Sequence, residues 1–248
     1  MRLSNAANAL LNNWWRACTS VARPLVAAAL PQRCAMCARA TGAAALCEPC
    51  AAALARSGPA CPRCALPSPA GAVCGRCLAH PPPFDAAIAI GPYAFPLDRL
   101  VVRLKYGGDL ALASALGERL AELALATGAA GRVSAIVPMP LAPARQRARG
   151  CNQAREIAKA LARRTGVPLA PGLVRVRSAA PQAALPWRER VRNVRAAFDT
   201  SRRFDGLSVA LVDDVMTSGA TAAAATAALR RAGAARIEVW VAARTLPG

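Results

Sequence analysis

Eight cysteines in four C-x-x-C pairs constrain the fold of this chain more than any other feature. They form two halves of spacing C-x2-C-x9-C-x2-C, one following the other along the chain. Each pair makes a turn that points two thiolates at one metal, and two such turns complete a tetrahedron. The spacing therefore predicts two structural zinc ions. Their predicted ligands are Cys34, Cys37, Cys47, Cys50, Cys61, Cys64, Cys74 and Cys77.

Disulfide bonds and a thioredoxin-like redox pair are the competing interpretations of these cysteines. The start of the chain shows no secretory signal, so we expect a cytoplasmic protein, in which disulfides are rare. A redox C-x-x-C normally stands alone near a βαβ unit. Four thiolates leave a zinc ion no open position, which argues against a catalytic metal. The spacing leaves open whether the pairs combine sequentially, within each half, or in a crossed manner between halves.

The charge of the chain favours anionic partners. The formal net charge is +19 over 248 residues, and nearly all the basic residues are arginine. Such a balance fits phosphate-bearing small molecules or nucleic acid. General arginine enrichment, parallel to the excess of alanine, is the alternative explanation. Because no stretch approaches about 18 uninterrupted apolar residues, we expect no transmembrane segment.

Three segments are predicted from the changes in composition. Residues 1–33 form an N-terminal arm, in which apolar residues recur at helical spacing between Leu3 and Val21. Residues 34–79 form the double zinc ribbon. The run His80-Pro81-Pro82-Pro83-Phe84 interrupts regular structure, and residues 84–248 follow as the larger domain.

Alternating strands and helices in the larger domain predict an α/β fold. Such alternation implies a mainly parallel sheet flanked by helices, with ligands binding beyond the carboxyl ends of the strands. The predicted strands are 86–90, 133–137, 208–212 and 236–242. The predicted helices are 97–105, 110–126, 152–165 and 220–232.

Residues 209–221, with the sequence VALVDDVMTSGAT, are the most informative run. An apolar strand leads to Asp213 and Asp214, and a loop of small hydroxyl residues and glycine then opens a helix. Successive backbone N–H groups and a helix N-terminus make such a loop an anion site, and the two acids are suited to sugar hydroxyls. An ordinary strand–turn–helix with acids near a helix start is the alternative. Neither a Walker loop nor a dinucleotide fingerprint is present.

This run resembles the signature of type I phosphoribosyltransferases. The chain as a whole resembles the ComF family, competence-associated proteins that join a double zinc ribbon to such a domain. The further segments that carry the resemblance are 104–109 (LKYGGD), 137–141 (VPMPL), 145–154 (RQRARGCNQA), 181–182 (PQ) and 190–194 (RVRNV).

The resemblance implies a type I phosphoribosyltransferase-like sheet and a binding site for 5-phosphoribosyl-1-pyrophosphate. Asp213 and Asp214 would bind the ribose hydroxyls, directly or through Mg²⁺. Residues 175–195 would form a hood over the acceptor. The residues implied to surround the 5-phosphate are Thr217, Ser218, Gly219, Ala220 and Thr221. Those implied on the pyrophosphate side are Pro138, Met139, Pro140, Lys105, Tyr106, Arg145 and Arg149.

Two functions follow as expectations. The first is a phosphoribosyltransferase acting on an acceptor that the sequence does not identify. The second is a non-catalytic or sensing module that binds single-stranded DNA through the ribbons and arginines, together with DNA-uptake proteins. Arg145, Arg147 and Arg149 fit either a nucleic-acid contact or a solvated face, and the low aromatic content disfavours a stacking platform. A purely structural scaffold leaves the 209–221 run unexplained.

Overall fold

The structure is a computed structural model that describes residues 32–42, 44–54, 58–176 and 197–247. The chain divides into two compact units, Met1–Cys50 and Ala51–Gly248. The predicted N-terminal helical arm lies outside the described residues, as does most of the predicted hood. The predicted division into segments 34–79 and 84–248 stays a prediction.

The first unit contains the first four cysteines. Strand β1 (Gln32–Arg33) pairs antiparallel with β2 (Ala40–Gly42), and helix α2 (Glu48–Ala52) follows. The turn between the strands is closed by backbone hydrogen bonds, including Cys34 N to Arg39 O at 2.8 Å. These short elements bury few large side chains, as expected for a segment whose folding depends on a metal.

The second unit begins with the second cysteine loop, which packs against the larger domain. This loop carries a short 3-10 turn, η1 (Pro69–Gly71), and helix α3 (Gly75–Ala79). Ala65 is fully buried in the main core cluster, and Ala87 N donates to Pro62 O at 2.9 Å. The second cysteine loop and the sheet therefore share one core.

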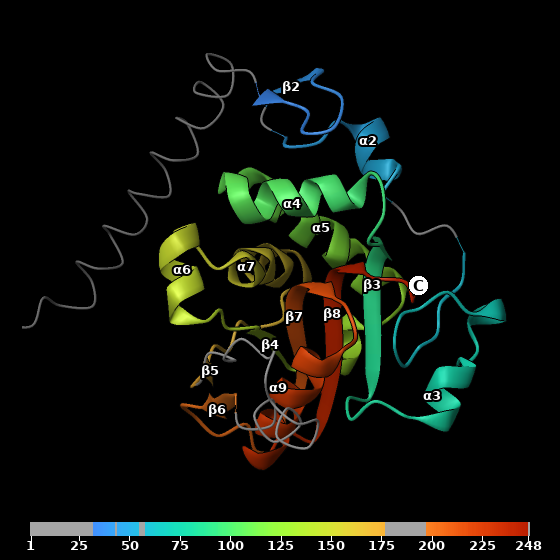
Figure 1. Cartoon of the computed structure of the whole chain (residues 1–248), viewed down its shortest axis with the longest axis vertical. Helices are drawn as coiled ribbons and strands as arrows, with labels where there is room; N and C mark the ends of the chain where they lie inside the picture. The colour runs from blue at the N-terminus through green and yellow to red at the C-terminus, as the bar shows by residue number, and fades with distance from the viewer. Residues whose placement is uncertain (1–31, 43, 55–57, 177–196, 248) are drawn as a thin grey trace, which may run out of the picture. The chain divides into compact units, whose positions relative to one another are not determined.

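The α/β prediction is confirmed: a parallel sheet forms the centre of the second unit (Figure 1). Its strand order is β3-β8-β7-β4, and each neighbouring pair is parallel. The strands are β3 (Ala86–Pro92), β4 (Ala135–Pro138), β7 (Ser208–Met216) and β8 (Arg236–Arg244). A separate antiparallel pair consists of β5 (Leu173–Arg175) and β6 (Phe198–Thr200).

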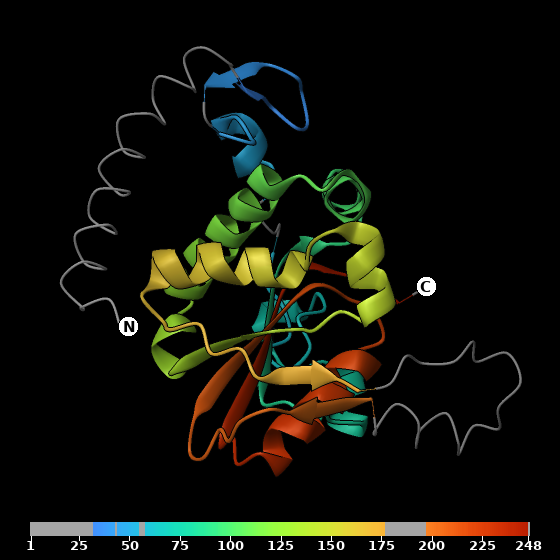
Figure 2. The same cartoon turned by 90° about the vertical axis from the view of Figure 1, so that its left-hand side faces the viewer.

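Helices cover both faces of this sheet (Figure 2). The helices are α4 (Leu97–Gly107), α5 (Leu110–Ala126), α6 (Pro143–Arg149), α7 (Gln153–Thr165) and α9 (Ala220–Arg231), with a 3-10 turn η2 (Ala130–Arg132). Val209 and Leu211 of β7 join the core cluster that contains Ala225 and Leu229 of α9. Successive side chains of a strand alternate between faces, and α5 and α7 pack together over the other face.

The structure differs from the sequence-based expectation at several points, among them the unpredicted strands β5 and β6. Strand β7 continues four residues beyond Val212, because Asp213, Val215 and Met216 pair in parallel with Val241, Ala243 and Arg244 of β8. Helix α6 was not predicted; its seven residues carry no apolar periodicity. Among the described residues, no helix is both long and apolar enough to cross a membrane.

Close packing of α5 on α7 gives a first testable prediction. A Cβ added at Gly117 would lie 2.5 Å from Ile157 O and 2.7 Å from Ala160 Cβ. Gly117→Ala should therefore destabilise the protein by about 2–3 kcal/mol, although alanine is the better helix former. Urea denaturation followed by circular dichroism measures this. The matched control is Gly131→Ala, whose Cβ would meet nothing within 4 Å; equal stability of the two variants would contradict the packing account.

Candidate functional site

The turn between β7 and α9 is exposed and presents unpaired backbone donors. The side chains of Thr217, Ser218 and Thr221 are exposed, and Gly219 adopts the left-handed φ of 85° that starts α9. Among the described residues, the N–H groups of 217–219 and 221 have no hydrogen-bond acceptor, whereas Ala220 N donates to Ser218 Oγ at 3.3 Å. Clustered free N–H groups at a helix start favour a bound anion.

Asp213 and Asp214 lie near the end of β7, whose last residue is Met216. Adjacent strand residues point to opposite faces, so the two side chains have different neighbours, although their charges still interact. Asp213 lines a small hollow with Thr217, Gly219 and Thr221. Asp214 forms an ion pair with Lys105 at the end of α4, with Nζ 3.4 Å from Oδ2. The structure thus brings the predicted acids and the predicted Lys105 to the same edge of the sheet.

Ionisation of Asp213 is opposed by its surroundings. Burial raises the pKa of Asp213 to about 8, and the charge of Asp214 adds to the effect. Two contacts offset only part of this increase in pKa. The N–H of Asp214 donates to Asp213 Oδ1 at 2.8 Å, and Lys105 contributes its positive charge. An acidic pair in this state is suited to receive a cation or hydroxyl donors.

The raised pKa gives a pH-dependent prediction for the ligand-free protein. The pKa of Asp213 is about 8 in the folded protein, whereas an ordinary aspartate has a pKa of about 4. Between these two pH values the folded chain keeps a proton on Asp213 that the unfolded chain loses. The free energy of unfolding therefore falls as the pH rises through this range. Asp213→Asn removes this penalty and should raise the melting temperature at pH 8 by a few degrees. Melting curves at pH 4 and pH 8 test this; a gain of the same size at both pH values would contradict the assignment.

The Pro138-Met139-Pro140 turn lies directly beside the acids. Pro138 pairs with Val212 in the sheet, and Met139 N donates to Val212 O at 2.8 Å. Asn152, which caps α7, donates from Nδ2 to Met139 O at 3.0 Å. This contact fixes the turn that the sequence analysis assigned to the pyrophosphate side.

Arginines border the site on α6 and β5. Arg145 and Arg147 are exposed, and the guanidinium of Arg149 lies 5.7 Å from the centre of the exposed Tyr106 ring. Arg175, at the end of β5, is a further arginine near these residues. Burial lowers the pKa of Arg175, Arg145 lowers it further, and Asp213 partly offsets this. Arg175 therefore lies within electrostatic reach of both predicted site residues, a relation for which the sequence offers no local signal.

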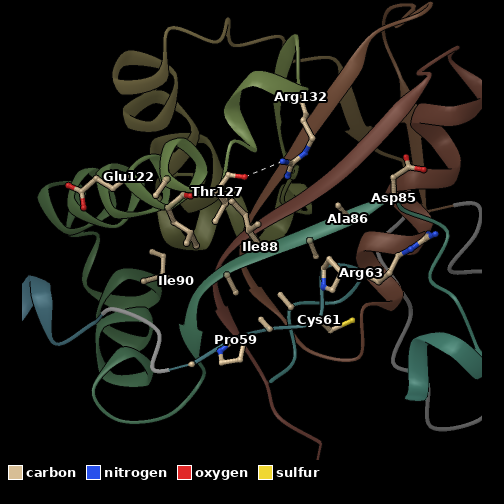
Figure 3. A pocket seen from close by; sticks show the side chains of 18 of the residues that line it. Pro59, Cys61, Arg63, Asp85, Ala86, Ile88, Ile90, Glu122, Thr127 and Arg132 are labelled. Atoms are coloured by element: carbon tan, nitrogen blue, oxygen red, sulfur yellow. Dashed lines mark hydrogen bonds between the residues drawn. The ribbon is translucent and has the colours of Figure 1, made fainter. Parts of the chain in front are cut away.

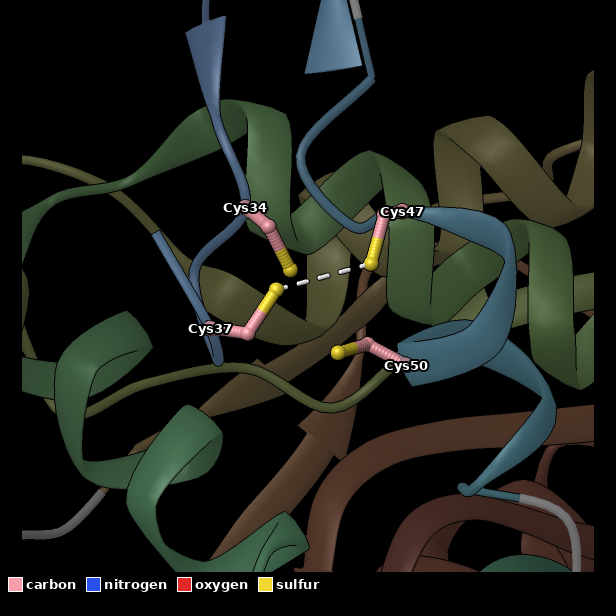
Figure 4. Close-up of side chains that lie close together, drawn as sticks. All are labelled: Cys34, Cys37, Cys47 and Cys50. Carbon is pink, nitrogen blue, oxygen red and sulfur yellow. Dashed lines mark hydrogen bonds between the residues drawn. The ribbon is translucent and has the colours of Figure 1, made fainter. Parts of the chain in front are cut away.

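The eight paired cysteines form two groups of four, one from each half of the spacing. Figure 4 shows the first group, Cys34, Cys37, Cys47 and Cys50. Within each group the sulfurs all lie within 4.8 Å of one another. Sulfur atoms bound to one tetrahedral zinc ion at about 2.3 Å are separated by about 3.8 Å, close to the 3.6 Å of Cys37–Cys47 and of Cys64–Cys74. The pairing is sequential, which resolves the alternative that the spacing left open.

The acidities of the thiols also fit a divalent cation. Burial raises the pKa of the Cys34 thiol. Backbone N–H donors, chiefly that of Cys47, outweigh this effect and lower the pKa to about 6. The hydrogen bond with Cys47, burial and the nearby Cys34 raise the pKa of Cys50 to about 12. Four thiols this close oppose one another's ionisation unless a cation is present. The two tetrads thus fit two structural zinc ions.

A separate cavity of about 820 Å³ lies along β3, between the second cysteine loop and α5 (Figure 3). Of the predicted site residues, only Cys61 lines it. Arg132 and Arg236, two of its charged residues, pair with the fully buried Glu238 at 2.9 and 3.0 Å. The cavity is therefore distinct from the β7–α9 turn.

Known proteins are similar to this chain in sequence. The family described as "Double zinc ribbon domain" matches residues 25–78. DNA utilization protein YhgH of Salmonella typhimurium is 37% identical over 191 residues, covering 75% of this chain and 84% of the relative. Competence protein F of Haemophilus influenzae is 35% identical over 179 residues, covering 69% and 78%. The chain belongs to the ComF family.

Some solved structures match part of this chain with low TM-scores. Glutamine phosphoribosylpyrophosphate amidotransferase from B. subtilis, complexed with ADP and GMP, is 23% identical, with a TM-score of 0.41 over 57% of this chain and 30% of that chain. Purine phosphoribosyltransferase from Pyrococcus horikoshii is 12% identical, with a TM-score of 0.34 over 52% and 82%. The ComF family assignment rests on the sequence relatives.

Proposed function

We propose that this ComF-family protein binds 5-phosphoribosyl-1-pyrophosphate at the β7–α9 turn and transfers phosphoribose to an acceptor, in the cytoplasm. The observation that carries the proposal is the exposed turn at 217–221, whose free N–H groups follow two carboxylates at the end of a parallel strand. The free N–H groups suit the 5-phosphate. The two acids suit the ribose hydroxyls of such a ligand.

In the proposed reaction a nucleophilic acceptor forms a bond to the anomeric carbon, and the bond from that carbon to pyrophosphate breaks. Pyrophosphate leaves with the electron pair. Positive charge develops on the sugar and negative charge on the leaving group, so carboxylates near the first and cations near the second lower the barrier. In this proposal Asp213 and Asp214 serve the sugar, and the cations for the leaving group are Lys105, which pairs with Asp214, and Arg149 of α6, which donates to Gln153.

The acidic pair fits Mg²⁺ chemically. Carboxylate oxygens are the protein ligands that Mg²⁺ prefers, and a cation would counter the burial and the charge of Asp214 that raise the pKa of Asp213. When bound with the ligand, Mg²⁺ would neutralise the pyrophosphate. Asp213 and Asp214 are the residues that would hold it, directly or through the ribose hydroxyls.

Calorimetric titration of the full-length zinc-loaded protein tests the proposal. With 5-phosphoribosyl-1-pyrophosphate and Mg²⁺ we expect saturable binding of one molecule per chain. Ribose, which lacks both phosphate groups, should bind too weakly to detect. If 5-phosphoribosyl-1-pyrophosphate does not bind, the proposed function is wrong.

A second candidate is binding of single-stranded DNA without catalysis, in company with DNA-uptake proteins. It is favoured by helix α6, whose Arg145 and Arg147 are exposed and whose Arg149 lies over Tyr106. Arginines that neutralise several phosphates require affinity to fall steeply with salt. Fluorescence anisotropy with a labelled oligonucleotide at increasing salt tests this candidate. An affinity for DNA that does not change with salt concentration would exclude this mode of DNA binding.

A further inference from the structure

A buried arginine links the second cysteine tetrad to the phosphate turn. Arg244, the last residue of β8, has only 3% of its surface exposed. Its Nε donates to Cys64 O at 2.9 Å, and its Nη1 donates to Met216 O at 2.9 Å and also to Thr217 O. One guanidinium thus holds a zinc-ligand loop and the turn after β7 together.

These contacts bear on the direction of the turn's N–H groups. In a trans peptide, the C=O and N–H of one unit point in opposite directions. The carbonyls of Met216 and Thr217 belong to the same peptide units as the N–H groups of Thr217 and Ser218. By holding both carbonyls on its own side, Arg244 directs both N–H groups away from itself, toward the face where an anion would bind.

The charge of Arg244 has no carboxylate partner among the described residues. A buried guanidinium without compensating charge is unfavourable. Four thiolates and one zinc ion carry a net charge of −2, and Cys64, one of these four ligands, is in direct contact with Arg244 through its carbonyl. The second tetrad therefore supplies both a hydrogen-bond acceptor and the counter-charge.

The geometry points to Arg244 as a positioning residue through which the second tetrad, when it holds zinc, fixes the phosphate turn in its binding conformation. This inference rests on the proposed function of the turn. In this account the second ribbon is part of the ligand site's support, whereas the first tetrad has no such role. Loss of zinc from the second tetrad, by chelation or thiol oxidation, should then weaken phosphate binding.

The test compares Arg244→Met and Arg244→Lys with Arg63→Met in the full-length, zinc-loaded protein. Arg63 is exposed and adjacent to Cys64, so its variant removes the same charge beside the same tetrad without touching the turn. Readouts are zinc content, melting temperature, NMR order parameters of the 217–221 amides, and calorimetric affinity for 5-phosphoribosyl-1-pyrophosphate with Mg²⁺.

For Arg244→Met we expect lower order parameters at Thr217 and Ser218 and affinity weakened about five- to thirtyfold. Arg244→Lys keeps the charge but has one nitrogen, so partial recovery of affinity is expected. Arg63→Met should match the wild type. Cys64→Ser should disorder the turn as Arg244→Met does, whereas Cys37→Ser in the first tetrad should cost one zinc ion and leave the turn's order parameters unchanged.

Wild-type order and affinity in Arg244→Met would overturn the inference, as would equal effects of Cys37→Ser and Cys64→Ser on the turn. If Arg244→Met does not fold, Arg244→Lys decides: an unchanged turn in that folded variant is equally contradictory. If the wild type does not bind the ligand, the proposed function fails. The order parameters still report whether Arg244 couples the second tetrad to the turn.

Discussion

Asp213→Asn combined with Asp214→Asn should weaken binding of 5-phosphoribosyl-1-pyrophosphate about a hundredfold or more. A hydrogen bond to a charged group contributes about 1.5–3 kcal/mol, and two lost carboxylates therefore cost about 3–6 kcal/mol. This corresponds to a factor of about 10² to 10⁴ in the dissociation constant. Calorimetry on the two proteins, side by side with Mg²⁺ present, measures the ratio.

The matched control changes two acids outside the proposed site. Glu118→Gln with Asp205→Asn removes the same charge from two exposed positions. This control should bind within about twofold of the wild type, because screened surface charges contribute little. Equal affinity of the wild type and the Asp213/Asp214 variant for the ligand would show that the two acids do not bind it.

The second large effect concerns zinc. The protein should contain two zinc ions per chain, and Cys37→Ser with Cys47→Ser should contain one. These two cysteines lie in different C-x-x-C pairs but in the same tetrad. Under the sequential arrangement their loss empties one site only. Structural zinc supplies about 10–16 kcal/mol in zinc-finger peptides, so the segment around the empty site should lose its fold.

Elemental analysis of the purified variant distinguishes the arrangements. A crossed arrangement would place Cys37 and Cys47 in different sites, and the variant would then contain no zinc. The complementary variant, Cys64→Ser with Cys74→Ser, should also retain one ion. It should in addition lower the melting temperature of the α/β domain, because the second tetrad packs against the core through Ala65.

The sequence was sufficient where local spacing determines structure. The four strands of the sheet and helices α4, α5, α7 and α9 follow from apolar periodicity and from glycines such as Gly108 and Gly166, whose positive φ ends a helix. The eight zinc ligands follow from cysteine spacing. The placement of Asp213 and the Pro138–Pro140 turn at one sheet edge follows from the parallel topology, since carboxyl ends of parallel strands meet there.

The remaining features depend on contacts between distant parts of the chain. Arg244 donates to a carbonyl 180 positions earlier, and no local pattern marks that relation. Arg175 of β5 and Asp213 of β7 act on each other electrostatically although they belong to different sheets. Sequential pairing of the cysteines was undecided because both halves have identical spacing, and the extension of β7 through two acids depends on its pairing with β8.

The account depends on where a sugar phosphate binds, and a crystal structure of the zinc-loaded protein with 5-phosphoribosyl-1-pyrophosphate and Mg²⁺ tests this most directly. The account predicts 5-phosphate oxygens about 3 Å from the backbone nitrogens of 217–221 and ribose hydroxyls at Asp213 and Asp214. A ligand bound elsewhere, such as in the cavity along β3, with the turn left empty, would contradict it.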